Sequence, residues 1–300
     1  MKIFLHLLWT AIILLFISCG DYSASDVYAE NSGNFTYSIT DGTAVVTGYT
    51  GEPEFIEIPH EIDGCPVSEI SERAFSGCNT LKRIIFPETL RKIGDYGFYA
   101  CYSLEIAALP DDVESLGEGC FCGCTRLSYM KIPDGLTEIP DSCFRACTNL
   151  GEMKIPSNVR KIGSFCFSGC TALAYVSLGE NLSEAGERAF FMCSSLESMY
   201  IPSSMKKIGR EAFGFVPSNV GAAVRCGFTL CGKIDSEADH YAESSGIRFR
   251  PSSESIQALI KCRLKSKSLK ISEFSLISVI IILAASMFKG KYCRRIKRLS

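Results

Sequence analysis

The chain has 300 residues, of which 47% are hydrophobic and 21% are charged, and its formal net charge is −2. The charge is unevenly spread, because residues 30–250 contain 19 Lys and Arg against 29 Asp and Glu, a net charge of −10. Nucleic-acid-binding surfaces are basic, so an acidic segment of this length argues against nucleic acid as a partner.

Residues 1–29 have the pattern of a signal peptide. Lys2 precedes an uncharged, mostly apolar run at residues 3–17, as in the charged and apolar regions of such peptides. Small residues near Ala29 favour cleavage after that residue. Two alternatives stay open. Cys19 lies in a Ser-Cys-Gly sequence that resembles a lipoprotein processing site, which would make the protein lipid-anchored at Cys19, and the apolar run could also remain as an uncleaved anchor.

Residues 30–65 are expected to form an N-terminal cap with a hairpin. Apolar and polar residues alternate over 35–39, and Asp41-Gly42 is typical of a two-residue hairpin turn. The segment 55–59 then has the sequence pattern of the strand found in each of the repeats that follow.

Residues 66–215 contain one 23-residue pattern seven times, without an insertion. Three columns come into register when the sequence is shifted by 23 residues. The phenylalanine column is Phe75, Phe98, Phe121, Phe144, Phe167, Phe190 and Phe213. The cysteine column is Cys78, Cys101, Cys124, Cys147, Cys170 and Cys193, and the leucine column is Leu81, Leu104, Leu127, Leu150, Leu173 and Leu196. A period in the twenties predicts a solenoid.

Each repeat has two halves. One half ends in the alternation of Leu150, Met153 and Ile155 and is closed by Pro156, which predicts a short strand that the proline terminates. In the other half Ile70, Ala74 and Cys78 stand four residues apart, which predicts a helical turn, and a glycine after the isoleucine column would permit a positive φ. The predicted fold is therefore an α/β-type solenoid with one short parallel strand and one helical turn per 23-residue repeat, capped at both ends.

The pattern closely resembles the BspA-type leucine-rich repeat. Residues 155–173 read Ile-Pro-Ser-Asn-Val-Arg-Lys-Ile-Gly-Ser-Phe-Cys-Phe-Ser-Gly-Cys-Thr-Ala-Leu, and many of these columns agree in phase over about half of the chain. The resemblance implies a curved solenoid. It also implies a bacterial cell-surface protein that binds host proteins, other cells or matrix.

Four segments are expected after the repeats. Residues 216–250 are predicted to form a C-terminal cap with a strand near 228–231, a helix that ends at Gly246 and a closing strand near 247–249. Residues 251–270 are serine-rich and basic and are interpreted as a stalk. Residues 271–288 form a marginal transmembrane helix, because the uncharged core spans only about 22 Å of a hydrocarbon layer of about 30 Å. A buried helix is the alternative. Residues 289–300 are a basic tail.

The signal peptide sets the expected topology. It places the repeats outside the cell and the C-terminal tail in the cytoplasm, as in a single-pass cell-surface membrane protein.

Sixteen cysteines in a secreted chain would normally indicate disulfides. Here six belong to the cysteine column, and Cys120, Cys143 and Cys166 replace small residues before the phenylalanines. A residue that recurs in every repeat has a stacking cause, so we expect mostly free, buried thiols. A disulfide is possible between Cys226 and Cys231, with two buried thiols as the alternative. Cysteine spacing gives no zinc motif, and we predict neither a metal site nor another cofactor.

Motifs for catalysis are lacking in this sequence. The histidines outside the signal peptide, His60 and His240, lie near no obvious nucleophile, and no phosphate-binding glycine loop or nucleophile elbow occurs. The chain is therefore predicted not to be an enzyme.

Outward residues of the strands are the candidate binding site. They vary between repeats while the inward residues recur, so the core does not dictate them, and aromatic and arginine side chains dominate protein interfaces. The predicted partner-binding residues are Arg83, Tyr129, Lys131, Glu152, Lys154, Tyr175 and Tyr200. The tyrosines and lysines of this set are expected at the centre of the surface. An inert polar face is the alternative.

Three functions are compatible with these features. The first is recognition or adhesion through a protein partner or a cell-surface or matrix ligand. The second is an envelope spacer without a specific ligand, and the third is a receptor that signals inward. The sequence predicts neither the ligand nor the oligomeric state.

Overall fold

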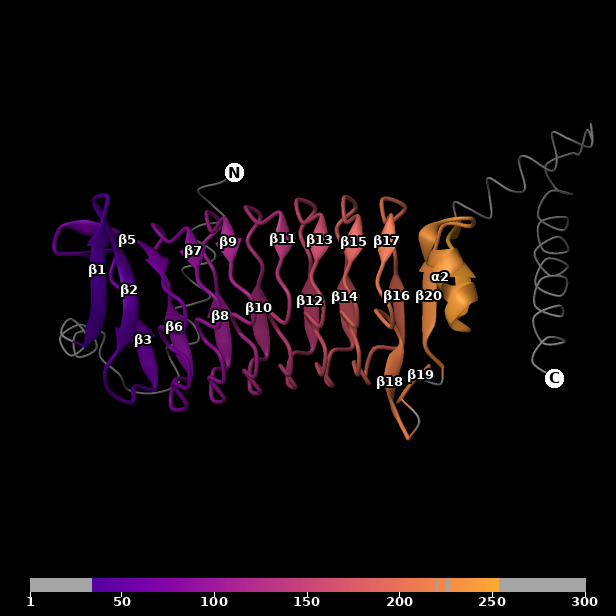
Figure 1. The fold of residues 1–300 in the computed structure, drawn as a ribbon, viewed down its shortest axis with the longest axis horizontal. Coiled ribbons are helices and arrows are strands. Elements are labelled where there is room, and N and C mark those ends of the chain that lie inside the picture. The colour runs from indigo at the N-terminus through magenta and orange to yellow at the C-terminus, as the bar shows by residue number, and fades with distance from the viewer. Residues whose placement is uncertain (1–33, 220, 225–226, 254–300) are drawn as a thin grey trace, which may run out of the picture.

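A computed structural model describes residues 34–219, 221–224 and 227–253. These residues form one elongated stack of coils. Strands β1 (Phe35–Thr40) to β5 (Cys65–Ile70) lie at one end, and strand β20 (Thr229–Gly232), helix α2 (Glu237–Ser245) and strand β21 (Arg248–Pro251) lie at the other (Figure 1). Within the seven repeats each coil follows the previous one by 23 residues, because parallel partners in adjacent coils differ by that number, as in Tyr129 opposite Ile106. The predicted solenoid is confirmed.

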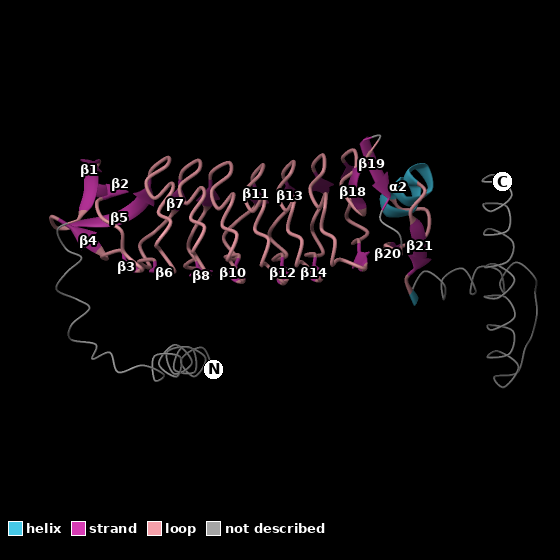
Figure 2. Cartoon of the chain, turned by 90° about the horizontal axis from the view of Figure 1, so that it is seen from below, coloured by secondary structure: helices cyan, strands magenta, loops and turns pink. Residues whose placement is uncertain are grey.

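A first row of parallel strands runs along the whole stack (Figures 1 and 2). In chain order its members are β3 (Phe55–Glu57), β6 (Arg83–Ile85), β8 (Ile106–Ala108), β10 (Tyr129–Lys131), β12 (Glu152–Lys154), β14 (Tyr175–Ser177), β16 (Ser198–Tyr200), β20 (Thr229–Gly232) and β21 (Arg248–Pro251). Both caps therefore add strands to the row, which extends beyond the seven repeats.

A second row of parallel strands replaces part of the predicted helical turn. Its members are β2 (Thr43–Tyr49), β5 (Cys65–Ile70), β7 (Lys92–Ile93), β9 (Ser115–Leu116), β11 (Glu138–Ile139), β13 (Lys161–Ile162), β15 (Glu184–Ala185) and β17 (Lys207–Ile208). Each repeat thus has two strands rather than one. Ile70, which was expected on a helix, ends β5.

No helix forms between residues 66 and 215, all of which the structure describes. The residue two positions before each phenylalanine has a φ of 53° to 58°, and a right-handed helix cannot pass through that conformation. These residues are Arg73, Tyr96, Gly119, Ser142, Phe165, Arg188 and Glu211. Backbone N–H groups here donate to the next coil, as Phe75 does to Gly97 at 2.8 Å, instead of to a residue four positions earlier. The helical turn was a wrong prediction for this reason.

The five glycines that follow the second row approach the previous coil closely and have no positive φ, while Ser71 and Pro140 take the same position in the other two repeats. A Cβ at Gly163 would lie 2.4 Å from the backbone N of Asp141 in the previous coil, and one at Gly117 would lie 2.3 Å from the N of Asp95. Neither glycine has a positive φ. Where this position is glycine, the absence of a Cβ lets the backbones of successive coils approach closely.

A ladder of phenylalanine rings forms the centre of the core. All seven rings of the phenylalanine column are at most 1% exposed, and neighbouring rings stack with centroids 5.0 to 5.7 Å apart. The leucine column and the central residues of the strands pack around this ladder. A single coil cannot bury its own apolar side chains, because they are covered by the coils on either side. The core therefore forms only when the coils stack.

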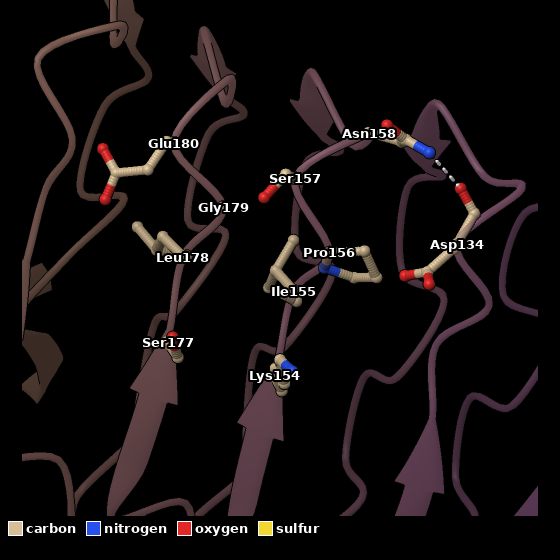
Figure 3. Close-up of a pocket in the computed structure, with 10 residues that line it drawn as sticks. All are labelled: Asp134, Lys154, Ile155, Pro156, Ser157, Asn158, Ser177, Leu178, Gly179 and Glu180. Carbon is tan, nitrogen blue, oxygen red and sulfur yellow. Dashed lines mark hydrogen bonds between the residues drawn. The ribbon is translucent and has the colours of Figure 1, made fainter. Parts of the chain in front are cut away.

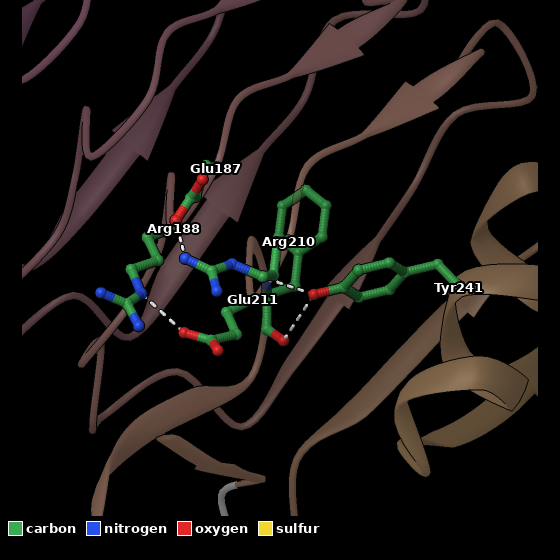
Figure 4. A network of polar contacts seen from close by, with 6 residues as sticks. Glu187, Arg188, Arg210, Glu211 and Tyr241 are labelled. Carbon is green, nitrogen blue, oxygen red and sulfur yellow. Dashed lines mark hydrogen bonds and ion pairs between the residues drawn. The ribbon is translucent and has the colours of Figure 1, made fainter. Parts of the chain in front are cut away.

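Tyrosines cover the ladder at both ends. Tyr49 of the hairpin formed by β1 (Phe35–Thr40) and β2 packs on Phe75, with ring centroids 6.4 Å apart. At the other end Tyr241, on α2 (Glu237–Ser245), stands edge-on to Phe213 and its hydroxyl accepts a hydrogen bond from the Phe213 N–H at 3.1 Å (Figure 4). Helix α2 ends at Gly246 in the left-handed conformation, as its sequence predicts.

Two further pairings lie outside the two rows. Strand β4 (Glu61–Ile62) pairs with β5 in a short hairpin. Strands β18 (Phe215–Ser218) and β19 (Gly221–Val224) form a hairpin that leads away from the last repeat and that the sequence pattern does not predict. Proline in β18 and small residues in β19 explain why no strand pattern was visible there.

Several predicted segments lie outside the described residues: the signal peptide 1–29 with Cys19, most of the stalk 251–270, the helix 271–288 and the tail 289–300. In the part of the chain that the structure does describe, no helix is both long and apolar enough to cross a membrane.

Candidate functional site

The first strand row presents two columns of outward side chains. In each of its repeat strands the middle residue is buried and the flanking residues face out, as in β10, where Met130 is 5% exposed and Tyr129 is 43% exposed. One column is Arg83, Ile106, Tyr129, Glu152, Tyr175 and Ser198, and the other is Ile85, Ala108, Lys131, Lys154, Ser177 and Tyr200. The inward and outward positions are those that the sequence predicts.

Large side chains are exposed along much of this face. Tyr175 is 62% exposed and Tyr200 is 44% exposed, and Ile85 and Ile106 are each 45% exposed on β6 and β8. An apolar or aromatic side chain therefore stands on five of the six outward-facing repeat strands β6 to β16, with the charged β12 as the exception. Interfaces are enriched in such residues relative to other surfaces.

Predicted site residues are spread along the row rather than gathered at one point. Glu152 lies opposite Tyr175 in the parallel ladder of β12 and β14, and Lys154 lies opposite Ser177. Arg83 lies at the far end of the row, on β6, where its guanidinium carbon is 5.8 Å from the centroid of the Phe55 ring. The structure therefore separates Arg83 from the residues on β12, β14 and β16.

The charged side chains of the first strand row differ in whether they form ion pairs within the protein. Lys131 Nζ lies 2.6 Å from Asp111 Oδ1 in the preceding repeat, and its side chain is 31% exposed. Glu152 and Lys154 form no ion pair within 4.0 Å with any described residue. The Lys131 ammonium is thus oriented by the protein, whereas the charges of β12 face solvent.

The hydrogen-bonded ladder of the row is interrupted between β10 and β12 and between β14 and β16. A shallow groove of about 600 Å³ lies at the second interruption. Its lining residues are Ala174, Tyr175, Val176, Ser177, Leu178, Glu180, Ser195, Glu197, Ser198, Met199, Tyr200 and Cys231. A second hollow of about 490 Å³ adjoins it after β12 and β14, lined in part by Lys154, Asn158 and Glu180 (Figure 3).

Glu180 and Glu197 are groove residues that the sequence did not single out. Glu180 follows Gly179, the only departure from the proline column Pro87, Pro110, Pro133, Pro156 and Pro202. A Cβ at Gly179 would lie 2.4 Å from the Pro156 carbonyl oxygen, so this loop packs unusually close to its neighbour. The replacement of proline by Gly179 is the feature of the sequence that could have drawn attention to Glu180.

The second strand row is a structural surface. Its outward charges pair between adjacent coils, with Nζ to carboxylate distances of 2.9 Å for Lys92 and Glu69, 3.7 Å for Lys161 and Glu138, and 2.6 Å for Lys207 and Glu184. Side chains that are already paired in this way are less able to form ion pairs with a ligand.

Cysteines of the column are packing residues. The thiol of each of Cys101, Cys124, Cys147, Cys170 and Cys193 donates to the carbonyl of the phenylalanine 26 residues earlier, with Sγ to O distances of 3.0 to 3.2 Å. Burial raises the pKa of Cys170 to about 12 and that of the partly exposed Cys78 to about 11. All twelve cysteines within the described ranges are free thiols.

The remaining chemical predictions have different outcomes. Cys231 lies on β20, half-buried, while Cys226 lies outside the described residues, so their disulfide stays a prediction. Among described residues no cluster of three His, Cys, Asp or Glu side chains could hold a metal ion. His60 follows β3 and His240 lies on α2, at opposite ends of the stack, so they cannot act on one small substrate (Figure 1).

A constant core and a variable strand face define this molecule as a leucine-rich solenoid with an exposed surface available for recognition. Residues 53–152 and 137–219 match the BspA type leucine rich repeat region, in six copies. The chain belongs to this BspA-type leucine-rich repeat family. No curated protein sequence matches it.

Solved structures of bacterial leucine-rich repeat proteins share the fold. A Treponema pallidum leucine-rich repeat protein is 28% identical with a TM-score of 0.54, over 63% of this chain and 86% of that one. A leucine-rich cell surface protein from Faecalibacterium prausnitzii is 24% identical with a TM-score of 0.54, over 67% and 69% of the two chains. A leucine-rich repeat protein from Eubacterium ventriosum is 24% identical with a TM-score of 0.50, over 65% and 55%.

Proposed function

We propose that this chain is a non-enzymatic recognition or adhesion protein of a bacterial cell surface, which binds a protein partner or matrix ligand through the first strand row. One observation carries the proposal. The row exposes Tyr129, Tyr175 and Tyr200 at positions that the stacking of the core leaves free to vary. The strands fix the backbone beneath these rings and a tyrosine has few rotatable side-chain bonds, so ordering the rings on a partner costs little conformational entropy.

Family membership supports a binding role, because solenoids of this kind offer a long continuous face to a partner. The Faecalibacterium structure is of a cell surface protein, in line with the same placement here. In this proposal the signal peptide 1–29 exports the repeats, and the helix 271–288, or a lipid at Cys19, keeps them at the membrane.

The test compares the full chain with a strand-face variant carrying serine at Tyr129, Lys131, Lys154, Tyr175 and Tyr200. Binding is measured by biolayer interferometry against a panel of immobilised extracellular matrix proteins and against intact cells. The wild-type chain is expected to bind at least one of these saturably, and the strand-face variant is expected to lose at least tenfold in affinity.

A matched control carries five serines on the second strand row, at Lys92, Glu138, Lys161, Glu184 and Lys207. This control should bind like the wild-type chain. Unchanged binding by the strand-face variant would reject the proposed surface. A wild-type chain that binds nothing saturably would favour the envelope spacer instead.

A further inference from the structure

The groove between β14 and β16 has a composition that sets it apart from the rest of the strand face. It lies where two hydrogen-bonded ladders meet, since β14 pairs with β12 while β16 pairs with β20. Tyr175 and Tyr200, both exposed, are among its lining residues. The groove is therefore an open trough with two exposed aromatic side chains in its lining.

The side chains that line this trough carry negative charge, while Lys154 and Arg250 stand one strand further out, opposite Ser177 and Cys231. Its lining contains the two carboxylates of Glu180 and Glu197 and no lysine or arginine. Neither carboxylate forms an ion pair within 4.0 Å with any described residue. Glu180 borders both hollows, and its carboxylate points away from Ser157 and Asn158 (Figure 3).

Unpaired carboxylates beside exposed aromatic rings form a recognisable chemical combination. Ring faces attract cations through their quadrupole, and carboxylates accept charge-assisted hydrogen bonds from guanidinium or ammonium groups. Serine hydroxyls of Ser177, Ser195 and Ser198 add neutral donors and acceptors along the same trough. An anionic ligand would instead be repelled by Glu180 and Glu197.

We propose that the groove between β14 and β16 binds an extended basic polypeptide, with one arginine or lysine side chain at Glu197 beside the exposed ring of Tyr175 and a second at Glu180, at the other end of the trough. This inference rests on the proposed function, because it names the chemistry of the partner for the same strand face. The strands on both sides run parallel to the trough, so an extended segment can lie along it and place alternate side chains in it. The net charge of −10 over residues 30–250 favours the approach of a basic partner.

The test uses the purified full chain and a fluorescein-labelled peptide, Ser-Gly-Arg-Ser-Arg-Gly-Ser, followed by fluorescence anisotropy. A twin peptide with citrulline in place of both arginines has nearly the same shape without the charge. The arginine peptide is expected to bind saturably and more weakly as salt rises, and the citrulline peptide to bind at least tenfold more weakly.

Variants locate the binding. The double variant Glu180→Gln, Glu197→Gln keeps the shape of the groove and is expected to weaken binding of the arginine peptide about tenfold. The control Glu138→Gln, Glu184→Gln removes two carboxylates from the second strand row and is expected to leave this binding unchanged. Thermal unfolding, followed by circular dichroism, checks that all variants are folded.

Three results would overturn the inference. They are equal affinity for the arginine and citrulline peptides, no saturable binding of either, and unchanged binding by the double variant. Binding of maltoheptaose, lost in Tyr175→Ser but kept in the double variant, would also overturn it by assigning the groove to a neutral sugar. A protein partner that loses affinity for the strand-face variant but binds the Glu180→Gln, Glu197→Gln variant normally would leave the proposed function standing. It would reject only the cation site.

Discussion

The glycine column after the second strand row leads to a sharp prediction about stability. Gly163 stands where a Cβ would lie 2.4 Å from both the backbone N and the Oδ1 of Asp141, and 2.6 Å from the carbonyl carbon of Pro140. Two of these three atoms belong to the backbone, which cannot move aside as the end of a flexible side chain can. Gly163→Ala is therefore expected to force two coils apart.

The size of the effect follows from the contacts. Ordinary van der Waals contact needs about 3.5 Å, so the coils must separate locally by about 1 Å. At the same place the Gly163 N–H donates to the Ile139 carbonyl at 2.8 Å and the Ser164 N–H donates to Asp141 Oδ1 at 2.7 Å. Overpacking costs about 1–3 kcal/mol, and each weakened hydrogen bond adds about 1 kcal/mol. We expect a loss of about 3 kcal/mol.

Urea unfolding of the full chain, followed by circular dichroism, measures this loss. Gly151 provides a matched control in the same repeat, because a Cβ there would meet nothing within 4 Å and its φ is not positive. Gly151→Ala should leave stability unchanged or raise it by about 0.5 kcal/mol, since alanine restricts the unfolded chain. If Gly163→Ala cost less than about 1 kcal/mol, or no more than Gly151→Ala, the close stacking of the coils would not depend on this column.

Three further predictions concern the core and the surface. Phe144→Ala, at the middle of the ring ladder, should lower the free energy of unfolding by about 3–5 kcal/mol in urea titrations, and Phe144→Leu should lower it less. Burial raises the pKa of Cys170 to about 12 from an ordinary value of 9.0, so the folded chain keeps a proton that the unfolded chain releases above pH 9. Under reducing conditions the free energy of unfolding should therefore fall as the pH rises from 8 to 10. This fall should be about 1 kcal/mol smaller in Cys170→Ala than in the wild-type chain. A parallel fall in both proteins would contradict this. Lys207→Ala removes an exposed pair with Glu184 and should cost less than about 1 kcal/mol, with high salt reducing the difference further.

The repeat period made much of the core predictable. A residue type that returns every 23 positions must face the same environment in each coil, so the period alone predicts that Phe144, Cys147 and Leu150 are buried, as they are. Local backbone geometry was not predictable in the same way. Ile70, Ala74 and Cys78 have a spacing that fits a helix, but the positive φ of Arg73 between them has no signature in the residue type.

Candidate site residues were predictable only in part. Alternation along a three-residue strand is enough to place Tyr129 and Lys131 outward and Met130 inward. The groove beside Tyr175 forms because β14 and β16 belong to separate hydrogen-bonded ladders. Which strands pair between coils cannot be predicted from the sequence of either coil. Glu180 and Glu197 lie in segments flanking the strands, where sequence patterns carry the least information.

The equal step between coils also has a consequence for how such a chain can change over generations. All seven repeats join the same ring stack, and most also share the thiol bond and the glycine contact, so loss or duplication of 23 consecutive residues rejoins matching surfaces. A deletion of residues 144–166 would bring Phe167 onto Phe121 in the place of Phe144. The core would be conserved, while the order of tyrosines and charges on the strand face would be reshuffled in one event. Recombination between repeats could thus change what the surface recognises faster than point substitution does, at little cost to folding.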